Sequence, residues 1–275
     1  MPLVINTNVS SLNAQRYLTS NTNGLGKTME KLASGFRINR AGDDAAGLQV
    51  SEKLRAQVRG SQKALDNVQD GINMLNIADG AYQSITDAVQ RMRELAVQAA
   101  NDTYSSSQRS AMQTEYDSLA SGIIQMAEAA QFNGIHLLDA SALSEVNLQI
   151  TANEGGNADD LDIKSALIDI ASVATAGSLL SHASAQTAIA TLDDAIDEIN
   201  EARGKLGAFT NRLEYTAQNL ATNIENTAAS ESRVRNVDVA MESANLARNQ
   251  ILQQASQAML SQANQAPQLA LQLLR

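Results

Sequence analysis

Hydrophobic residues recur every three or four positions over three long stretches of this chain. In the first stretch the steps alternate between four and three, which is the heptad repeat of a helix that packs along one stripe. The repeat predicts a helix from about residue 45 to residue 100, roughly 80 Å long at 1.5 Å per residue. The stripe consists of Leu54, Val58, Ser61, Leu65, Val68, Ile72, Leu75, Asp79 and Tyr82.

Two later stretches repeat the same spacing. One consists of Met112, Tyr116, Leu119, Ile123, Met126 and Ala130, and the other of Ile189, Leu192, Ile196, Ile199, Arg203, Leu206, Thr210, Leu213, Ala217, Leu220 and Ile224. The only prolines are Pro2 and Pro267, so the interior lacks the strongest helix breaker. We therefore predict a mainly α fold, an elongated antiparallel coiled-coil bundle.

One stretch between the second and third stripes has the alternation of a strand instead. In "EVNLQITA", Val146, Leu148 and Ile150 alternate with polar residues, and "LDI" resumes the alternation after the turn-like "NEGGNADD". We predict a small β-hairpin over about residues 139–170, lying against the bundle. Residues 171–187 are small and polar, as in a loop or a domain-boundary segment.

The two ends of the chain are amphipathic but only sparsely apolar, and isolated helices of this kind are marginal in water. We expect them to pair with each other or with other copies of the chain. The residues assigned to packing between subunits are Val9, Leu12, Leu18, Leu25, Met29, Leu32, Met241, Leu252, Met259, Leu269 and Leu271.

A glycine-rich break, "SGFRINRAGDD", separates the first end from the bundle. Gly35 and Gly42 free the backbone to change direction, and Asp43 or Asp44 can cap the long helix that follows. The predicted domains are a terminal tier, residues 1–43 and 236–275 with a spoke at 34–43, and a bundle tier, residues 44–235. The return spoke is expected near residues 232–238.

Composition narrows the classes of partner. The formal net charge is −10, which disfavours nucleic acid and anionic membrane surfaces, and no apolar run approaches the roughly 20 residues that span a bilayer. Aromatic residues are only 3% of the chain, which suits thin helix seams, and the absence of cysteine excludes disulfides. The N-terminus lacks the pattern of a cleaved signal peptide.

No constellation of residues indicates catalysis. His136 and His182 have no neighbours at the spacing of metal ligands or of a general base. The acidic residues from Asp193 to Glu201 lie on a helix face, and "GGNADD" only half-matches a calcium repeat. We therefore expect no catalytic, cofactor-binding or metal-binding residue, and no enzyme activity.

Several motifs in order along the chain resemble bacterial flagellins: "INTNVSSLNAQRYL", "LASGFRINRAGDDAAGLQVSEKLRAQVRG", "QDGINMLNIADGAY", "RMRELAVQAAND", "QFNGIHLLD", "LGAFTNRLEYTAQNL" and "ARNQILQQASQAMLSQAN". The resemblance covers nearly the whole chain. Flagellins commonly carry large outer domains between their helical halves, whereas this chain has only residues 171–187 there, so it is similar to a short form without them.

The resemblance implies a structural subunit of the bacterial flagellar filament, used in swimming motility and exported to the cell exterior without a cleaved signal peptide. An alternative is a hook–filament junction protein, which shares the terminal motifs. The implied partners are other copies of the chain, a cap protein, hook-associated junction proteins and an export chaperone for the C-terminal segment. Host Toll-like receptor 5 is also implied, recognising the positions that correspond here to Arg91, Leu95 and Glu115.

Overall fold

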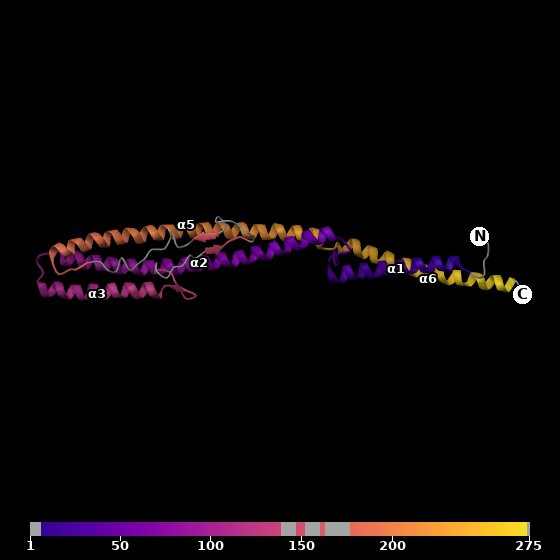
Figure 1. The fold of residues 1–275 in the computed structure, drawn as a ribbon, viewed down its shortest axis with the longest axis horizontal. Coiled ribbons are helices and arrows are strands. Elements are labelled where there is room, and N and C mark those ends of the chain that lie inside the picture. The colour runs from indigo at the N-terminus through magenta and orange to yellow at the C-terminus, as the bar shows by residue number, and fades with distance from the viewer. Residues whose placement is uncertain (1–6, 139–146, 152–159, 163–176, 274–275) are drawn as a thin grey trace. The chain divides into compact units, whose positions relative to one another are not determined.

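The computed structural model describes residues 7–138, 147–151, 160–162 and 177–273. The described chain divides into two compact units, Met1–Ala56 with Asn226–Arg275, and Gln57–Glu225. Its helices are α1 (Val9–Ser34), α2 (Ala45–Ala99), α3 (Ser106–Ala129), α5 (His182–Arg235) and α6 (Val239–Leu273) (Figure 1). The prediction of a mainly α, coiled-coil fold with a small hairpin is confirmed.

In the second unit the core follows heptads on α2 and α5. Buried residues recur every seventh position on α2, at Ser61, Val68, Leu75, Tyr82, Val89 and Ala96. On α5 the corresponding buried row is Leu192, Ile199, Leu206, Leu213 and Leu220. On α3, Tyr116 is fully buried, and this burial raises the pKa of its hydroxyl to about 12. The predicted seams therefore form one continuous core.

A second row of α2 is more buried than its residue types indicate. Ala64, Gly71 and Ala78 are buried, whereas the larger predicted residues Leu65 and Ile72 are only half-buried. A Cβ built on Gly71 would lie 2.7 Å from Cδ1 of Leu148 and 3.4 Å from Cδ1 of Leu213. The small residues thus occupy the places where neighbouring segments approach α2 closely.

Ion pairs across the bundle show how its helices are registered. Arg203 Nε donates to Asp79 Oδ1 at 2.8 Å, and Arg93 pairs with Asp193, so α2 and α5 run antiparallel. The hydrogen bond from Arg93 lowers the pKa of Asp193. Because these side chains remain partly exposed to solvent, each pair contributes little to stability, and their main effect is on register.

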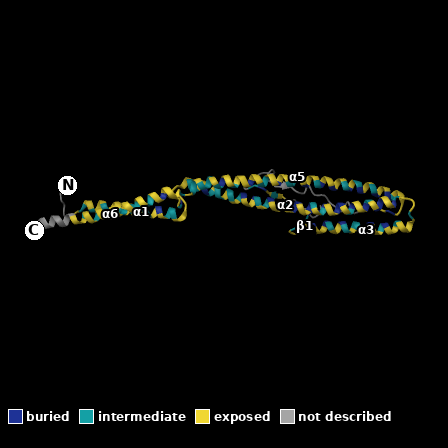
Figure 2. Cartoon of the chain, turned by 180° about the vertical axis from the view of Figure 1, so that it is seen from behind, coloured by how far each residue is buried: buried dark blue, intermediate teal, exposed yellow. Residues whose placement is uncertain are grey.

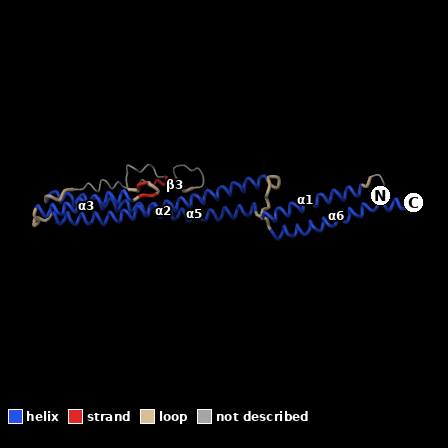
Figure 3. Tube along the Cα trace, turned by 90° about the horizontal axis from the view of Figure 1, so that it is seen from below, coloured by secondary structure: helices blue, strands red, loops and turns tan. Residues whose placement is uncertain are grey.

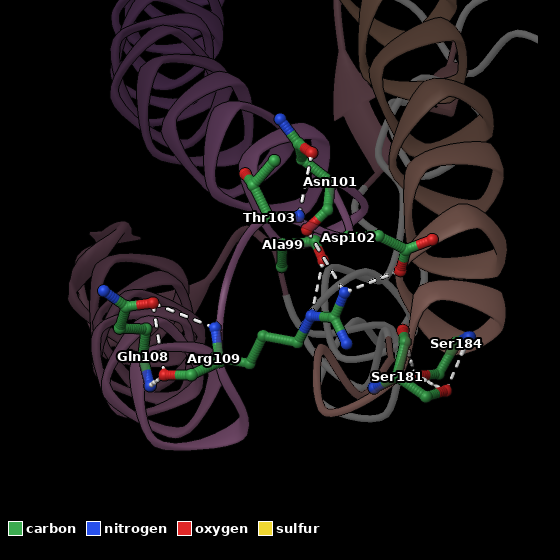
Figure 4. Close-up of polar contacts among 9 residues, drawn as sticks. Ala99, Asn101, Asp102, Thr103, Gln108, Arg109, Ser181 and Ser184 are labelled. Carbon is green, nitrogen blue, oxygen red and sulfur yellow. Dashed lines mark hydrogen bonds and ion pairs between the residues drawn. The ribbon is translucent and has the colours of Figure 1, made fainter.

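The turn from α2 to α3 is closed by one arginine (Figure 4). Arg109 Nε donates to the carbonyl of Ala99 at 3.0 Å, and its Nη2 reaches the side chain of Asp102 at 3.0 Å. Ser105 and Gln108 form a capping box at the start of α3. Backbone hydrogen-bonding groups at the end of α2 and at the beginning of α3 are therefore paired within this turn.

Two short hairpins accompany the bundle (Figure 3). The predicted hairpin is present as β3 (Asn147–Gln149) paired antiparallel with β4 (Asp160–Asp162), and Asn67 Nδ2 ties it to α2 through the carbonyl of Gln149 at 3.0 Å. The remaining residues of the predicted range 139–170, including most of "GGNADD", lie outside the described residues, apart from Ile150 and Thr151.

A second hairpin pairs β1 (Gln131–Phe132) with β2 (Ile135–His136). Its two turn residues, Asn133 and Gly134, have φ angles of 51° and 82°, as a type I′ turn requires. The Asn–Gly pair is visible in the sequence, but the flanking strands have only two residues each. That is too short for an alternating pattern to be detected.

The predicted loop over residues 171–187 is wrong from His182 onward, because α5 begins there. The hydroxyl of Ser181 accepts a hydrogen bond from the backbone N–H of Ser184 at 3.2 Å, which caps the helix. Residues 171–176 lie outside the described residues.

Two glycines in this unit provide a matched test of the packing. Gly177 has φ +90°, and a Cβ there would lie 2.7 Å from Cβ of Ala188, whereas a Cβ on Gly80 of α2 would meet nothing within 4 Å. We expect Gly177→Ala to lower the free energy of unfolding by about 2–4 kcal/mol through backbone strain and overpacking. Gly80→Ala should raise it by about 0.5–1 kcal/mol, since alanine is the better helix former. Urea denaturation followed by circular dichroism measures both, and equal effects would contradict the structure at Gly177.

Candidate assembly surface

Helices α1 and α6, called here the terminal pair, lie side by side and antiparallel in the first unit (Figure 1). The stripe of α1 that is buried or half-buried along the pair repeats as heptads, at Ser11, Ala14, Leu18, Asn21, Leu25, Thr28 and Leu32. Figure 2 shows the pair as mainly exposed or intermediate. Among the described side chains of residues 9–34 and 239–265, only Thr28 and Glu242 are buried. The terminal pair therefore buries none of its described apolar side chains fully.

Hydrogen bonds between polar side chains set the register of this pair. Asn21 Nδ2 donates to Ser256 Oγ at 2.8 Å, and Asn249 Nδ2 donates to Thr28 Oγ1 at 3.2 Å. In the first turn of α1, Ser11 Oγ donates to the side-chain oxygen of Asn264 at 2.7 Å. Polar residues at seam positions specify register at a cost in stability. The seam is specific, but it lacks the apolar burial that stabilises a two-helix coiled coil.

Asn8 links the beginning of α1 to a backbone carbonyl of α6 that a proline leaves unpaired. Its Oδ1 accepts the backbone N–H of Ser11 at 3.0 Å, which makes Asn8 the N-cap, and its Nδ2 donates to the carbonyl of Ala263 at 2.7 Å. That carbonyl would normally accept the N–H of the residue four positions later, which is Pro267 and has no N–H. The amide of Asn8 therefore satisfies the carbonyl that the proline leaves free.

Many of the large apolar residues of the terminal pair face solvent. Those exposed are Val9, Leu12, Tyr17, Met29, Val239, Met241, Ile251, Leu252 and Met259. Six of the residues assigned to packing between subunits are in this set, whereas Leu18, Leu25 and Leu32 are half-buried in the stripe that contains Asn21 and Thr28. The side chains of Leu269 and Leu271 lie outside the described residues.

Tyr17, Val239 and Ile251 are not among the residues expected to pack between subunits, yet they are 68%, 60% and 65% exposed. Their exposure could not be inferred from hydropathy alone, because the half-buried stripe of α1 mixes polar residues with alanine and leucine. One feature of the sequence could have indicated which residues face α6: Ser11, Asn21 and Thr28 are polar and lie on one heptad stripe. Once that stripe is assigned to the intrachain seam, the apolar residues off it must face outward.

The first connecting segment turns at Gly35 and is held by two aspartates. Gly35 has φ 74° and ends α1 in the left-handed conformation. Asp44 caps α2 by accepting the N–H of Gly47 at 2.9 Å, while Asp43 accepts the N–H groups of Asn39 and Arg40. These backbone hydrogen bonds, Arg40 first and then Asn39, lower the pKa of Asp43.

Gly42 does not have the role expected of it. It has no positive φ, and a Cβ there would meet nothing within 4 Å. The change of direction is therefore made at Gly35, and Gly42 is only a residue of the turn that follows.

The two connecting segments pair with each other within the first unit. Phe36 and Asn236 form an antiparallel bridge, and the N–H of Arg37 donates to the carbonyl of Arg235 at 2.7 Å. The guanidinium of Arg235 lies 4.7 Å from the centre of the Phe36 ring and donates to Glu52 at 2.8 Å. The return segment predicted near residues 232–238 is shorter than expected, because α5 continues to Arg235 and α6 begins at Val239. Backbone hydrogen bonds and the cation–π contact of Arg235 fasten this end of α5 to the first segment.

The three residues that the family resemblance assigns to receptor recognition differ in their exposure to solvent. Arg91 and Glu115 are exposed and form an ion pair of 2.9 Å between α2 and α3, and Arg91 also pairs with Glu94. The hydrogen bonds to Glu94 and Glu115 raise the pKa of Arg91. Leu95, four residues after Arg91, is 2% exposed and belongs to the bundle core. The side chain of Leu95 therefore has almost no exposed surface that a receptor could contact.

Within the described part of the chain, no three histidine, aspartate or glutamate side chains converge in a way that could hold a metal ion. His136 is bonded through Nδ1 to the carbonyl of Glu128 at 2.8 Å, and His182 begins α5. Nor is any described helix sufficiently long and apolar to cross a bilayer.

The Asn8–Pro267 relation can be tested by a double-mutant cycle. We expect Asn8→Ala to reduce the opening free energy of the terminal pair by about 1–2 kcal/mol, since the cap is lost and the Ala263 carbonyl is left unpaired. In a Pro267→Ala background the restored N–H satisfies that carbonyl, so Asn8→Ala should cost about 1 kcal/mol less. Amide hydrogen exchange of α1 measures each corner of the cycle. The same cost in both backgrounds would show that the proline and Asn8 are independent.

Comparisons with known proteins match both halves of the chain. The family model for the bacterial flagellin N-terminal helical region covers residues 5–142, and that for the C-terminal helical region covers residues 189–274. Flagellin of Halalkalibacterium halodurans is 45% identical, over 99% of this chain and 100% of that protein, and flagellin of Bacillus subtilis is 43% identical, over 98% and 99%. The flagellar filament 33 kDa core protein of Treponema phagedenis is 44% identical, over 99% and 100%.

A solved crystal structure of Bacillus cereus flagellin is 31% identical, with a TM-score of 0.48 over 60% of this chain and 94% of that chain. The family models together match most of the chain, and the relatives align with nearly all of it. The chain belongs to the bacterial flagellin family.

Proposed function

We propose that copies of this chain polymerise through the terminal pair into the flagellar filament of which the chain is a structural subunit. Membership of the flagellin family supports the filament, and relatives that align over their full length are named filament core proteins. The terminal pair is proposed as the polymerising surface chiefly because α1 and α6 leave their large apolar side chains exposed or half-buried.

The apolar burial of the terminal pair is incomplete within a single chain. Fully burying one large aliphatic side chain is worth about 1.5–3 kcal/mol, and the described pair buries none. Its polar seam already determines which residues of α1 face α6. Partners that cover the outward apolar residues therefore add stability without changing the intrachain register.

The charge distribution is compatible with close packing of many copies. From Asn249 to Leu273, α6 contains no aspartate, glutamate, lysine or arginine. Charged residues are depleted at the centres of protein interfaces because their desolvation is unfavourable. An uncharged stretch of this length can pack against its equivalents without burying unpaired charge.

The second unit has a complete core of its own and needs no partner for its burial. We therefore propose that residues 1–43 and 236–275 form the inner, polymerising tier, and that residues 44–235 form the bundle tier around it. The spoke at 34–43 would pass from one tier to the other. This division places the assembly surface on the element with the least intrachain burial.

Further partners are proposed from the family. They are a cap protein and hook-associated junction proteins at the filament ends, and an export chaperone for the uncharged C-terminal segment before assembly. The filament lies outside the cell, and we propose that the chain reaches it without a cleaved signal peptide. For Toll-like receptor 5, we propose recognition of Arg91 and Glu115, which are exposed, while Leu95 supports that face from the core.

A pair of substitutions on exposed apolar residues tests the proposed surface. Leu12 and Ile251 are 55% and 65% exposed, so replacing both with glutamine should leave the monomer folded. We expect Leu12→Gln with Ile251→Gln to raise the critical concentration for seeded polymerisation by at least about tenfold, because both contacts lose apolar burial. Light scattering and negative-stain electron microscopy provide the readout.

The matched control places glutamine at exposed polar positions of the same helices, Ser20→Gln with Ser243→Gln. We expect this control to polymerise more readily than the apolar-site variant, while both variants retain the helical circular dichroism of the parent. If the Leu12 and Ile251 variant assembled at the parental concentration, the terminal pair would not be the polymerising surface.

A further inference from the structure

The methionines in the described part of the chain fall into two sets according to their burial. Met74, Met92 and Met112 are 4%, 0% and 9% exposed and belong to the bundle core, and Met126 is half-buried against it. Met29, Met241 and Met259 are 49%, 61% and 69% exposed, and all three lie on the terminal pair. The only described methionines with largely open side chains are therefore on the surface proposed for assembly.

Exposure controls the chemistry of the thioether. With hydrogen peroxide, the sulfur attacks one peroxide oxygen, the O–O bond breaks, the S–O bond of a sulfoxide forms, and water leaves with the second oxygen. The product is polar and chiral, and methionine sulfoxide reductases return it to the thioether at the expense of thiols. The buried core methionines are shielded from this reaction, whereas the three exposed ones are open to it.

Oxidation at these three positions would leave the fold of the subunit unchanged but weaken its assembly. The hydrogen bonds that hold α1 to α6 are made by other residues, among them Asn21, Thr28 and Asn249. A sulfoxide on Met29, Met241 or Met259 therefore leaves the intrachain seam intact. It replaces an apolar group by a polar one on the outward surface, where a second copy would have to bury it.

We propose that Met29, Met241 and Met259 are sites of reversible oxidation, and that their sulfoxides keep the folded subunit from polymerising. This inference rests on the proposed function, since it matters only if the terminal pair is the polymerising surface. It also implies a direction: unassembled subunits are susceptible, and subunits in a polymer are protected because their neighbours cover the thioethers.

The experiment uses the purified full chain treated with hydrogen peroxide and then freed of it. Peptide mapping by mass spectrometry should find sulfoxide at the three exposed positions before Met74, Met92 or Met112. Circular dichroism should be unchanged, and the critical concentration for seeded polymerisation should rise at least about tenfold, a change of about 1.4 kcal/mol in the free energy of subunit addition. Methionine sulfoxide reductases with a thiol should reverse the rise.

Two variants assign the effect to these sites. In the variant Met29→Leu, Met241→Leu, Met259→Leu, the critical concentration with peroxide divided by that without should be close to one, whatever its untreated value. In Met126→Leu that ratio should stay as large as in the parent. The inference is overturned if the oxidised parent polymerises as the untreated parent does, if core methionines oxidise first, or if the triple variant remains peroxide-sensitive. Failure of the untreated parent to extend seeds would instead overturn the proposed function.

Discussion

Hydrogen bonds between polar side chains set how α1 and α6 align, although half-buried leucines share the same seam. Asn21 with Ser256 and Thr28 with Asn249 define the alignment of the two helices, and Asn8 completes it at the carbonyl left free by Pro267. A seam of this kind determines alignment, but net hydrogen-bond contributions are modest beside those of apolar burial. The terminal pair is thus precisely aligned yet weakly stabilised, and its apolar residues remain available to other copies.

The same seven-residue period has the opposite consequence in the second unit. There one row of α5, which repeats every seventh position from Leu192 to Leu220, consists of buried leucine and isoleucine, and it forms a core with α2 and α3. The period determines that a stripe faces a neighbouring helix, whereas the residue types on the stripe determine how much stability the contact supplies. One chain thereby combines a self-sufficient bundle with a helix pair whose burial is completed by polymerisation.

Periodicity allowed most of the bundle to be predicted from the sequence, because its seam residues are large and apolar. Prediction was incomplete where small residues lie in the core, as at Ala64, Gly71 and Ala78, since hydropathy does not reveal how closely another segment approaches. It was wrong at His182, where a serine cap begins α5 inside a polar segment that looks like a loop.

Exposure at the candidate site was the hardest property to predict. Leu18 and Met259 are both apolar residues on terminal helices, yet the first is half-buried and the second 69% exposed. Leu18 lies on the stripe of α1 that also contains Asn21 and Thr28, which hydrogen-bond to α6, whereas Met259 lies off the seam of α6. Likewise, the helical spacing of Arg91 and Leu95 indicates a shared direction, but α2 is covered on that side so that only Arg91 emerges.

The measurement that tests the account most directly is amide hydrogen exchange, followed by mass spectrometry, on the same protein as monomer and as seeded polymer. We expect amides of α1 and α6 to exchange faster in the monomer than the buried α2 and α5 amides of the bundle, and to become strongly protected on polymerisation, while the bundle amides are protected equally in both. Strong protection of α1 and α6 already in the monomer, unchanged by assembly, would contradict it.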